Sequence, residues 1–273
     1  MDCNERGDRM YQFFVKEEQV GKDFITITGP DVNHMKNVLR MKPGESVRVS
    51  SDTGKSYACS VLELTDTFVQ LDILDSQIAG TELPNRIFLF QALPKGDRME
   101  YIIQKAVELG VYEVIPVVMK YCVVKLDQKK AKAKVTRWQA IAESAAKQSK
   151  RSCIPVVHPV MSFQEAAAYA MTCSRRLVPY ENERGMQATA QALRSVRPGE
   201  SVSVMIGPEG GFAAEEIHAL RNHMQIVSLG KRILRTDTAA VAMMSLLMLH
   251  LEIELEMGME MMGEADGHGS IFR

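Results

Sequence analysis

The chain has 273 residues, of which 46% are hydrophobic and 25% are charged, and its formal net charge at pH 7 is −1. This balance is typical of a soluble globular protein and excludes a disordered chain, and the length allows two modest domains or one large one. The longest apolar run, 239–249, is too short to span a bilayer, and the N-terminal residues lack a stretch of signal-peptide type. We therefore expect a cytoplasmic protein that does not enter a membrane.

Residues 1–75 are expected to form a small β-rich domain. A helix over 31–40, capped by Asp31, interrupts its strands. Several short strands at this spacing predict a barrel or a sandwich, followed by a linker over 76–85. The expected strands are 24–28, 46–50, 57–64 and 68–74.

From Arg86 onward, strands alternate with helices in a second domain over 84–252, which predicts a parallel α/β sheet covered on both faces. The helix that begins at Thr236 is apolar nearly all round, so it must be buried in the sheet layer or against a second subunit. Residues 253–273 are rich in glycine and acidic residues and are expected to be a disordered acidic tail. The expected strands are 86–93, 114–118, 154–157, 176–179, 201–206 and 225–229. One expected helix ends at Leu109, and four others span 129–148, 163–171, 186–194 and 214–223.

The five cysteines and six histidines favour neither disulfides nor a metal. The cysteines lie far apart without a Cys-x-x-Cys pair, which is typical of reduced thiols in a cytosol. His218 and His223 are five residues apart, so they fall on different faces of a helix. We expect no bound metal.

The positive charge is concentrated in the middle of the chain. Residues 95–151 contain 13 Lys and Arg against 6 Asp and Glu, whereas 252–273 contain 6 acidic residues and 1 basic residue. Such a basic segment can present a positive face to nucleic acid. Composition alone favours a solvated, lysine-rich helix around 129–137.

Two loops follow strands in the second half, where ligands bind in parallel α/β sheets. Residues 207–211 hold three glycines and a proline, which let a ligand approach the backbone. Residues 229–237 lie between the last strand and the last helix. Phosphate binding is disfavoured, because neither glycine fingerprint is present and Glu209, Glu215 and Glu216 would repel an anion. A neutral or positively charged ligand such as a sulfonium fits better, and plain structural turns are the alternative.

Five ordered blocks resemble one family. Residues 206–212 (IGPEGGF) and 229–239 (LGKRILRTDTA) look like its two cofactor loops, and residues 95–100 with 104–111 look like its first strand–helix unit. Residues 148–151 with Pro155, and residues 11–14 with His34 and 38–40, are similar to two further motifs. The chain therefore resembles the RsmE-like 16S ribosomal RNA (uracil-N3) methyltransferases of the SPOUT class over about residues 10–250.

This resemblance implies an α/β fold with a knotted (trefoil) SPOUT methyltransferase domain behind a small N-terminal PUA-like β-barrel that binds RNA. It also implies a homodimer that uses S-adenosyl-L-methionine to methylate N3 of a uridine in 16S rRNA of the 30S subunit. Lys147 stands where the family often has an acidic residue, and Met10 looks like the family's usual start, so residues 1–9 are an extension or an alternative start.

The resemblance and the chemistry together assign candidate residues. Uridine N3 carries a proton, so the site needs a base or a cation that stabilises negative charge on the uracil oxygens. Arg98 is the candidate cation, with a phosphate contact or a surface ion pair as its alternative. Arg235 and Asp237 flank the second loop, and Asp237 is either a base or a helix cap. Leu177 is either part of the adenosine site or ordinary core. The expected cofactor residues are Leu177, Pro179, Tyr180, Ile206, Gly207, Pro208, Glu209, Gly210, Gly211, Leu229, Gly230, Ile233, Leu234 and Thr236, and the expected RNA contacts are Arg40, Lys95, Lys147, Lys150 and Arg151.

Two other functions remain open from the sequence. One is a non-catalytic RNA-binding protein for ribosome assembly, which the two intact loops disfavour. The other is a nicotinamide or nucleotide enzyme of Rossmann type, which the missing fingerprint and the acidic loop disfavour.

Overall fold

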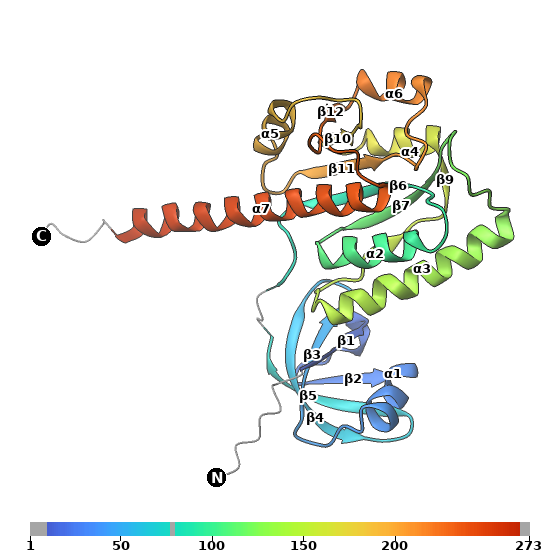
Figure 1. The fold of residues 1–273 in the computed structure, drawn as a ribbon. Helices are drawn as coiled ribbons and strands as arrows, with labels where there is room; N and C mark the ends of the chain where they lie inside the picture. Colours follow the sequence, from blue (N-terminus) through green and yellow to red (C-terminus); the bar gives the residue numbers. More distant parts are fainter. Residues whose placement is uncertain (1–9, 77–79, 268–273) are drawn as a thin grey trace, which may run out of the picture. The chain divides into compact units, whose positions relative to one another are not determined.

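The computed structural model describes residues 10–76 and 80–267. They form two units, Met1–Glu82 with Ala146–Ile154 and Leu83–Ala145 with Pro155–Arg273, and Figure 1 follows the chain through both. The division after Glu82 falls within the expected linker. The segment Ala146–Ile154 differs from the expectation, because it belongs to the first unit although the sequence analysis assigned it to the second domain.

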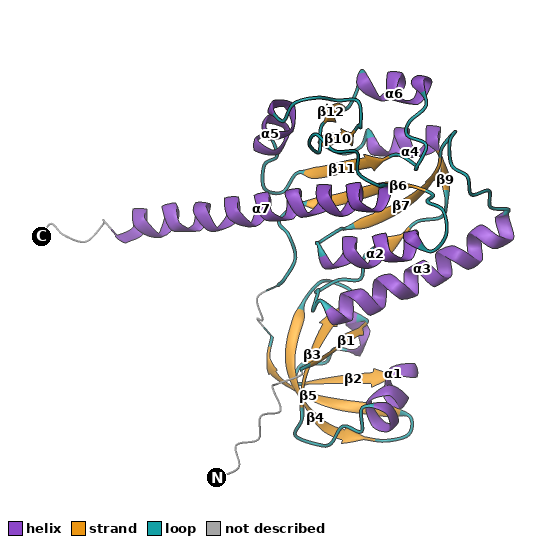
Figure 2. Ribbon diagram, in the orientation of Figure 1, coloured by secondary structure: helices purple, strands orange, loops and turns teal. Residues whose placement is uncertain are grey.

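Unit 1 is built on one five-stranded sheet with the order β1-β3-β4-β5-β2 (Figure 2). β1 runs parallel to β3, and the other neighbours are antiparallel. In β2, Ile25 and Ile27 are fully buried while the residues between and beside them are not, since alternate side chains point to opposite faces of a sheet. The strands are β1 (Tyr11–Val15), β2 (Phe24–Thr28), β3 (Ser46–Ser51), β4 (Ser56–Leu64) and β5 (Phe68–Asp75).

The helical piece of unit 1 differs in detail from the expected helix over 31–40. It begins as α1 (Pro30–Asn33) and continues as a π-helical turn, η2 (His34–Val38), and a short 3-10 turn, η1 (Glu17–Gln19), lies earlier in the chain. The N-cap is Gly29 with φ of 80°, so the expected capping by Asp31 is wrong. The helix begins at Pro30, one residue before the expected start at Asp31. Proline is favoured at the first helical position, and glycine adopts the positive φ of the preceding residue freely.

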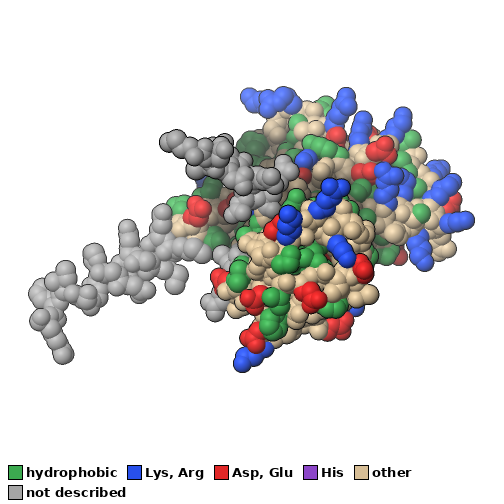
Figure 3. Space-filling view, turned by 90° about the horizontal axis from the view of Figure 1, so that it is seen from below, with side chains coloured by type: hydrophobic (Ala, Val, Ile, Leu, Met, Phe, Trp, Pro, Cys, Tyr) green, Lys and Arg blue, Asp and Glu red, His purple; other side chains and the backbone are tan. Residues whose placement is uncertain are grey.

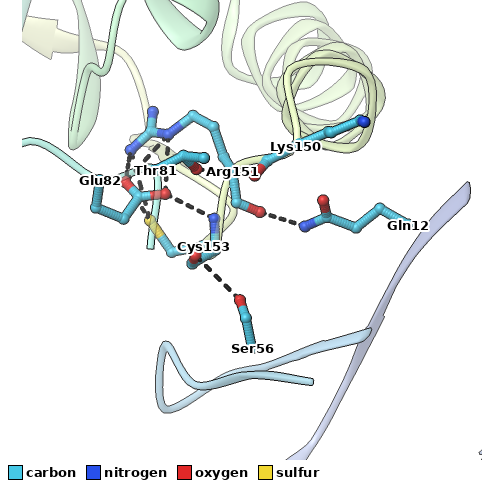
Figure 4. Close-up of polar contacts among 8 residues, drawn as sticks. Gln12, Ser56, Thr81, Glu82, Lys150, Arg151 and Cys153 are labelled. Carbon is cyan, nitrogen blue, oxygen red and sulfur yellow. Dashed lines mark hydrogen bonds and ion pairs between the residues drawn. The ribbon is translucent and has the colours of Figure 1, made fainter. Parts of the chain in front are cut away.

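The segment Ala146–Ile154 is fixed within unit 1 by a buried polar cluster (Figure 4). Arg151 is only 4% exposed and forms an ion pair with Glu82, whose carboxylate also accepts the Ser152 backbone N–H at 2.7 Å. Gln12 donates to the Arg151 carbonyl, and Thr81 donates to the Lys150 carbonyl at 2.8 Å. These contacts satisfy buried polar groups that no periodicity in the sequence reveals.

Unit 2 contains a seven-stranded sheet with the order β12-β10-β11-β6-β7-β8, and β9 also pairs with β7. Every pairing in it is parallel, so the expected parallel α/β sheet is confirmed. The strands are β6 (Arg86–Ala92), β7 (Glu113–Val118), β8 (Val156–Val157), β9 (Met161–Ser162), β10 (Arg175–Pro179), β11 (Ser201–Ile206) and β12 (Gln225–Val227).

Helices cover both faces of this sheet (Figure 1). Phe90 and Ala92 of β6 share a core with α4 and α6, whereas α7 contacts α2 and β11 on the other side. Gly110, with φ of +85°, ends α2 as expected for a C-terminal cap. The helices are α2 (Arg98–Glu108), α3 (Gln128–Gln148), α4 (Phe163–Ala170), α5 (Gln187–Arg194), α6 (Ala214–Arg221) and α7 (Thr236–Gly267).

The last helix is longer than the sequence analysis expected. α7 continues to Gly267, so the disordered tail expected from 253 onward is wrong as far as 267, and 268–273 lie outside the described residues. The added length is rich in Glu and Met, which are strong helix formers. By length and composition alone, Thr236–Met257 is sufficient to cross a membrane, whereas the run 239–249 was judged too short. Its first half instead packs inside unit 2, where Met243, Met244 and Leu247 are fully buried.

Candidate functional site

A pocket of about 390 Å³ opens in unit 2 where β10 and β11 end. It lies between the two loops that follow β11 and β12, which is where a parallel sheet leaves room for a ligand. Its lining residues are Pro179, Tyr180, Glu181, Ile206, Gly207, Pro208, Glu209, Gly210, Gly211, Phe212, Leu229, Gly230, Arg232, Ile233, Leu234, Arg235, Thr236 and Ala239.

The first loop, 207–211, needs its glycines for close packing. A side chain at Gly210 would come within 2.9 Å of Tyr121, and one at Gly211 would collide with the Glu181 carboxylate. Gly211 also has φ of +74° and closes a turn by donating its N–H to the Pro208 carbonyl at 2.9 Å. At its three glycines the loop therefore presents backbone to the pocket.

The second loop is tied to the first through Thr236. Its hydroxyl donates to the Gly207 carbonyl at 2.7 Å and accepts from the Gln91 side-chain amide at 2.9 Å. Gln91 lies near the end of β6 and is fully buried. Because three separate elements meet at one hydroxyl, the two walls of the pocket keep a fixed separation.

Acidic groups surround the first loop. Glu209 accepts from the Arg98 guanidinium at 2.8 Å and from the Lys95 backbone N–H at 2.9 Å. Glu216 accepts the backbone N–H groups of Ala213 and Lys120 at the start of α6. A hydrogen bond from Lys120, 2.5 Å away, lowers the pKa of Glu215, which keeps it ionised. A helix start already satisfied by carboxylates does not attract a phosphate, as the sequence analysis expected.

Comparison with known proteins decides the family. Residues 81–248 match the model of an RNA methyltransferase domain, and residues 27–74 match that of an RNA methyltransferase PUA domain. The ribosomal RNA small subunit methyltransferase E of Bacillus subtilis (strain 168) is 35% identical over 86% of this chain and 95% of its own length. The chain belongs to the ribosomal RNA small subunit methyltransferase E family. The resemblance stated from the sequence is confirmed.

Solved structures agree with this membership. The family member from Neisseria gonorrhoeae, bound to S-adenosyl methionine, has a TM-score of 0.73 and 33% identity, covering 86% of this chain and 96% of its own. A Legionella pneumophila protein in complex with the same cofactor has a TM-score of 0.74 and 30% identity, covering 88% and 97%. The RNA methyltransferase described here thus has a fold that accommodates this cofactor in two relatives.

The pocket of this RNA methyltransferase gathers nearly all the expected cofactor residues. Every one of them except Leu177 lines it, and Leu177 is 2% exposed within the core. Arg235, one of the three expected catalytic residues, also lines it. Asp237 lies in the first turn of α7, not at its cap, and accepts the Thr238 backbone N–H at 3.1 Å. Arg98 reaches the pocket rim through Glu209.

The expected RNA contacts are divided between the units. Lys95 is exposed at the start of α2 in unit 2, and Arg40 and Lys150 are exposed in unit 1 with φ of 55° and 58°. Lys147 is half-buried and pairs with Asp31 at 3.3 Å. Arg151 is buried against Glu82, so we do not carry it forward as a phosphate contact.

Several pocket residues escaped the sequence analysis. Gln91 does not line the pocket but holds Thr236, which does, and its polar side chain inside a mostly apolar strand is a visible signal. Arg232 stood within the second loop but was not chosen. Phe212 and Ala239 end the two segments that resemble cofactor loops, and Glu181 directly follows Tyr180, but none of the three was among the expected cofactor residues. The described residues contain no group of three or more His, Cys, Asp and Glu that could hold a metal ion.

Proposed function

We propose that this protein transfers the methyl group of S-adenosyl-L-methionine to N3 of one uridine in 16S rRNA of the small ribosomal subunit. The observation that carries the proposal is the pocket between two glycine-containing loops, lined by backbone, apolar side chains, two carboxylates and two guanidinium groups. Side chains at Gly210 or Gly211 would collide with Tyr121 or Glu181, so the glycines keep the pocket walls close without filling the pocket. Glu209 and Glu181 on the lining can lie beside a positively charged sulfonium, while Arg232 and Arg235 line the pocket from the second loop.

The protein's contribution to methyl transfer is chiefly alignment. The bound cofactor supplies an electrophilic methyl group on its sulfonium, and the displacement needs no metal. Thr236 joins the two loops through Gly207 and Gln91, so the pocket keeps its geometry when the substrate arrives. Holding donor and acceptor in line can lower the barrier by several kcal/mol, of a maximum of about 7–11 kcal/mol.

Arg98 activates the acceptor in this proposal. The N3 proton passes to a base, for which Asp237 is the candidate, and the negative charge left on the uracil oxygens is stabilised by a guanidinium beside them. Glu209 holds the Arg98 guanidinium at the pocket rim at 2.8 Å, so the cation is in place before RNA binds. Arg235, on the second loop, is the other cation of the site, and Asp237 is the carboxylate nearest to it in the chain.

Exposed cations hold the RNA. Lys95 and Lys150, with Arg40 from unit 1 and the half-buried Lys147, contact phosphates, so affinity falls as salt rises. Sequence choice comes from the shape of the rRNA and from an unpaired base turned out of its stack. The enzyme works in the cytoplasm, where ribosomal subunits are made.

A homodimer with a trefoil knot around the cofactor completes the proposal. Beyond its buried start, α7 exposes Leu249, Ile253 and Met257, each more than half exposed. An apolar helix face of this kind is suited to a second copy of the chain.

The direct test is incubation of the protein with labelled cofactor and 30S particles that lack the modification, followed by nucleoside analysis. The proposal predicts label in N3-methyluridine at one position. Label on a ribose hydroxyl or on protein would refute the assigned reaction. RNA binding without transfer, together with no cofactor binding by calorimetry, would favour the non-catalytic alternative.

A further inference from the structure

A second cavity, of about 220 Å³, lies in unit 2 on the loop that leads into α2. It shares no lining residue with the first pocket. A single ordered water needs only about 15 Å³, so this space is large enough for a small organic group. Its lining residues are Leu93, Pro94, Gly96, Asp97, Met99, Val124, Leu126, Lys134 and Trp138.

The cavity combines apolar walls with a polar rim. Trp138, Leu93 and Met99 are almost fully buried and form its inner walls. Lys134 places its ammonium 5.8 Å from the centre of the Trp138 ring, and Asp97 is exposed beside Gly96. A cavity with buried apolar walls, one ammonium and one carboxylate is suited to a heteroaromatic ring with polar edges.

The surface around the cavity is strongly basic. Residues 120–137 contain seven Lys and Arg and one acidic residue, Asp127. Most of these side chains are exposed, and Figure 3 shows Lys and Arg side chains gathered toward the end of the molecule where α3 begins. Charge complementarity therefore selects a polyanion as the carrier of the ring.

The loop that lines the cavity is also anchored to the first pocket. Lys95 donates its backbone N–H to Glu209 at 2.9 Å, and Arg98 reaches the same carboxylate at 2.8 Å. Leu93, Pro94, Gly96 and Asp97, on the same short segment, form part of the second cavity. One segment thus serves both spaces, so a strand that crosses it can enter both.

We infer that the second cavity receives an unpaired nucleobase of the RNA substrate. The exposed Lys125, Lys129 and Lys132 hold the flanking phosphates. Lys134 and Asp97 contact the edge of the base. This inference rests on the proposed function in one respect only, that the substrate is RNA.

Trp138 makes the test direct, because it is the only tryptophan in the chain. Its fluorescence is measured while a short single-stranded RNA, or an abasic ribose–phosphate oligomer of equal length, is added to the intact protein. We expect saturable quenching by the RNA and none by the abasic oligomer. Equal responses, or binding without any change in emission, would overturn the inference.

Two neighbouring valines supply a matched pair of variants. Val124 lines the cavity, whereas Val123 is 68% exposed and lies outside the lining. Val124→Phe fills the space and is expected to weaken RNA binding about 5- to 100-fold, the range for losing one stacked base, and to abolish the quenching. Val123→Phe is expected to leave both unchanged, and equal behaviour of the two would contradict the inference. If thermal unfolding shows that Val124→Phe does not fold, Leu126→Phe takes its place.

Cofactor binding separates this inference from the proposed function. Calorimetry should give the same S-adenosylmethionine affinity for Val124→Phe and wild type, because the first pocket shares no residue with the second. Quenching by RNA without methyl transfer would support the inference while refuting the proposed activity. Methyl transfer without quenching would do the reverse.

Discussion

In the proposed mechanism Arg98 stabilises the deprotonated acceptor base. It can be replaced without changing any residue that lines the pocket. Arg98→Ala is expected to lower the rate of methyl transfer about 100-fold or more, because a developing negative charge loses its preorganised donor. S-adenosylmethionine affinity should change little, since Arg98 itself does not line the pocket. Single-turnover transfer rates and calorimetry measure the two effects.

Arg175 provides the control for Arg98. It also pairs with a glutamate, Glu200, at 2.9 Å. However, Arg175 is the first residue of β10, and the pocket lies at the other end of that strand. Arg175→Ala should leave the transfer rate unchanged. A loss equal to that of Arg98→Ala would mean that arginine–glutamate pairs act here through the fold, and the role given to Arg98 would be wrong.

Glu82 is expected to make unit 1 sensitive to acid. Burial alone would raise its pKa, but the hydrogen bonds and charge of Arg151, with bonds from Cys153 and Ser152, hold the pKa below its usual value. Burial raises the pKa of the Cys153 thiol to about 11, so the thiol stays protonated and donates to Glu82. A carboxylate with a lowered pKa stabilises the fold above its unfolded pKa, and this stabilisation is lost as the pH falls through the folded pKa.

The measurement is thermal unfolding of wild type and Glu82→Gln between pH 7 and pH 3. Wild type should be the more stable at neutral pH, and the difference should shrink as the pH falls below about 4.3, the usual pKa of glutamate. A difference that stays constant over this range would show that Glu82 does not change its ionisation with the fold.

The residues of the site could be predicted where they belong to one continuous motif. They could not be predicted where only the folded chain brings distant residues together. The two loops gave nearly the whole pocket lining because each loop is contiguous in the chain. The ion pair of Arg151 could not be predicted, because its partner Glu82 lies 69 residues away. Tertiary pairing of this kind leaves no local pattern.

At the scale of elements, the role of the loop 207–211 in cofactor binding can be tested by substituting one of its glycines. A glycine with a similar positive φ in a turn of unit 1 serves as the control. Gly211→Ala places a methyl group against Glu181 at φ of +74°, whereas Gly44→Ala has φ of +88° and nothing within 4 Å. Both should lose about 1–3 kcal/mol of stability from the strained backbone. We expect only Gly211→Ala to weaken S-adenosylmethionine binding, by at least about tenfold if the pocket wall shifts.

Calorimetry on both variants checks this prediction. If Gly44→Ala weakened cofactor binding as much as Gly211→Ala, backbone strain and not the pocket wall would explain the loss. If neither variant affected binding, the loop 207–211 would not form part of the cofactor site.

The order of strands and helices was predictable because the pattern of hydrophobic residues switches between period 2 and helical period along unit 2. The π-helical turn His34–Val38 was not, since its shape depends on Met35 entering the core of unit 1. β9 was missed because two residues carry too little pattern.

For the whole molecule, the exposed apolar half of α7 predicts a dimer. Sedimentation velocity should give twice the mass of one chain for wild type, and Leu249→Glu with Ile253→Glu should give the single mass, because a carboxylate buried in an apolar interface is strongly unfavourable. Leu74 is 60% exposed in unit 1, so Leu74→Glu should remain dimeric. A wild-type monomer would show that α7 does not bind a second copy.

The central claim is that the two loops after β11 and β12 hold S-adenosylmethionine, and a crystal structure of the protein grown with this cofactor tests it most directly. We predict electron density for the cofactor between residues 207–211 and 229–236, with its sulfonium on the side of Glu209 and Arg98. Density at another place on the molecule, or loops that close the pocket and leave no room for adenosine, would contradict the account.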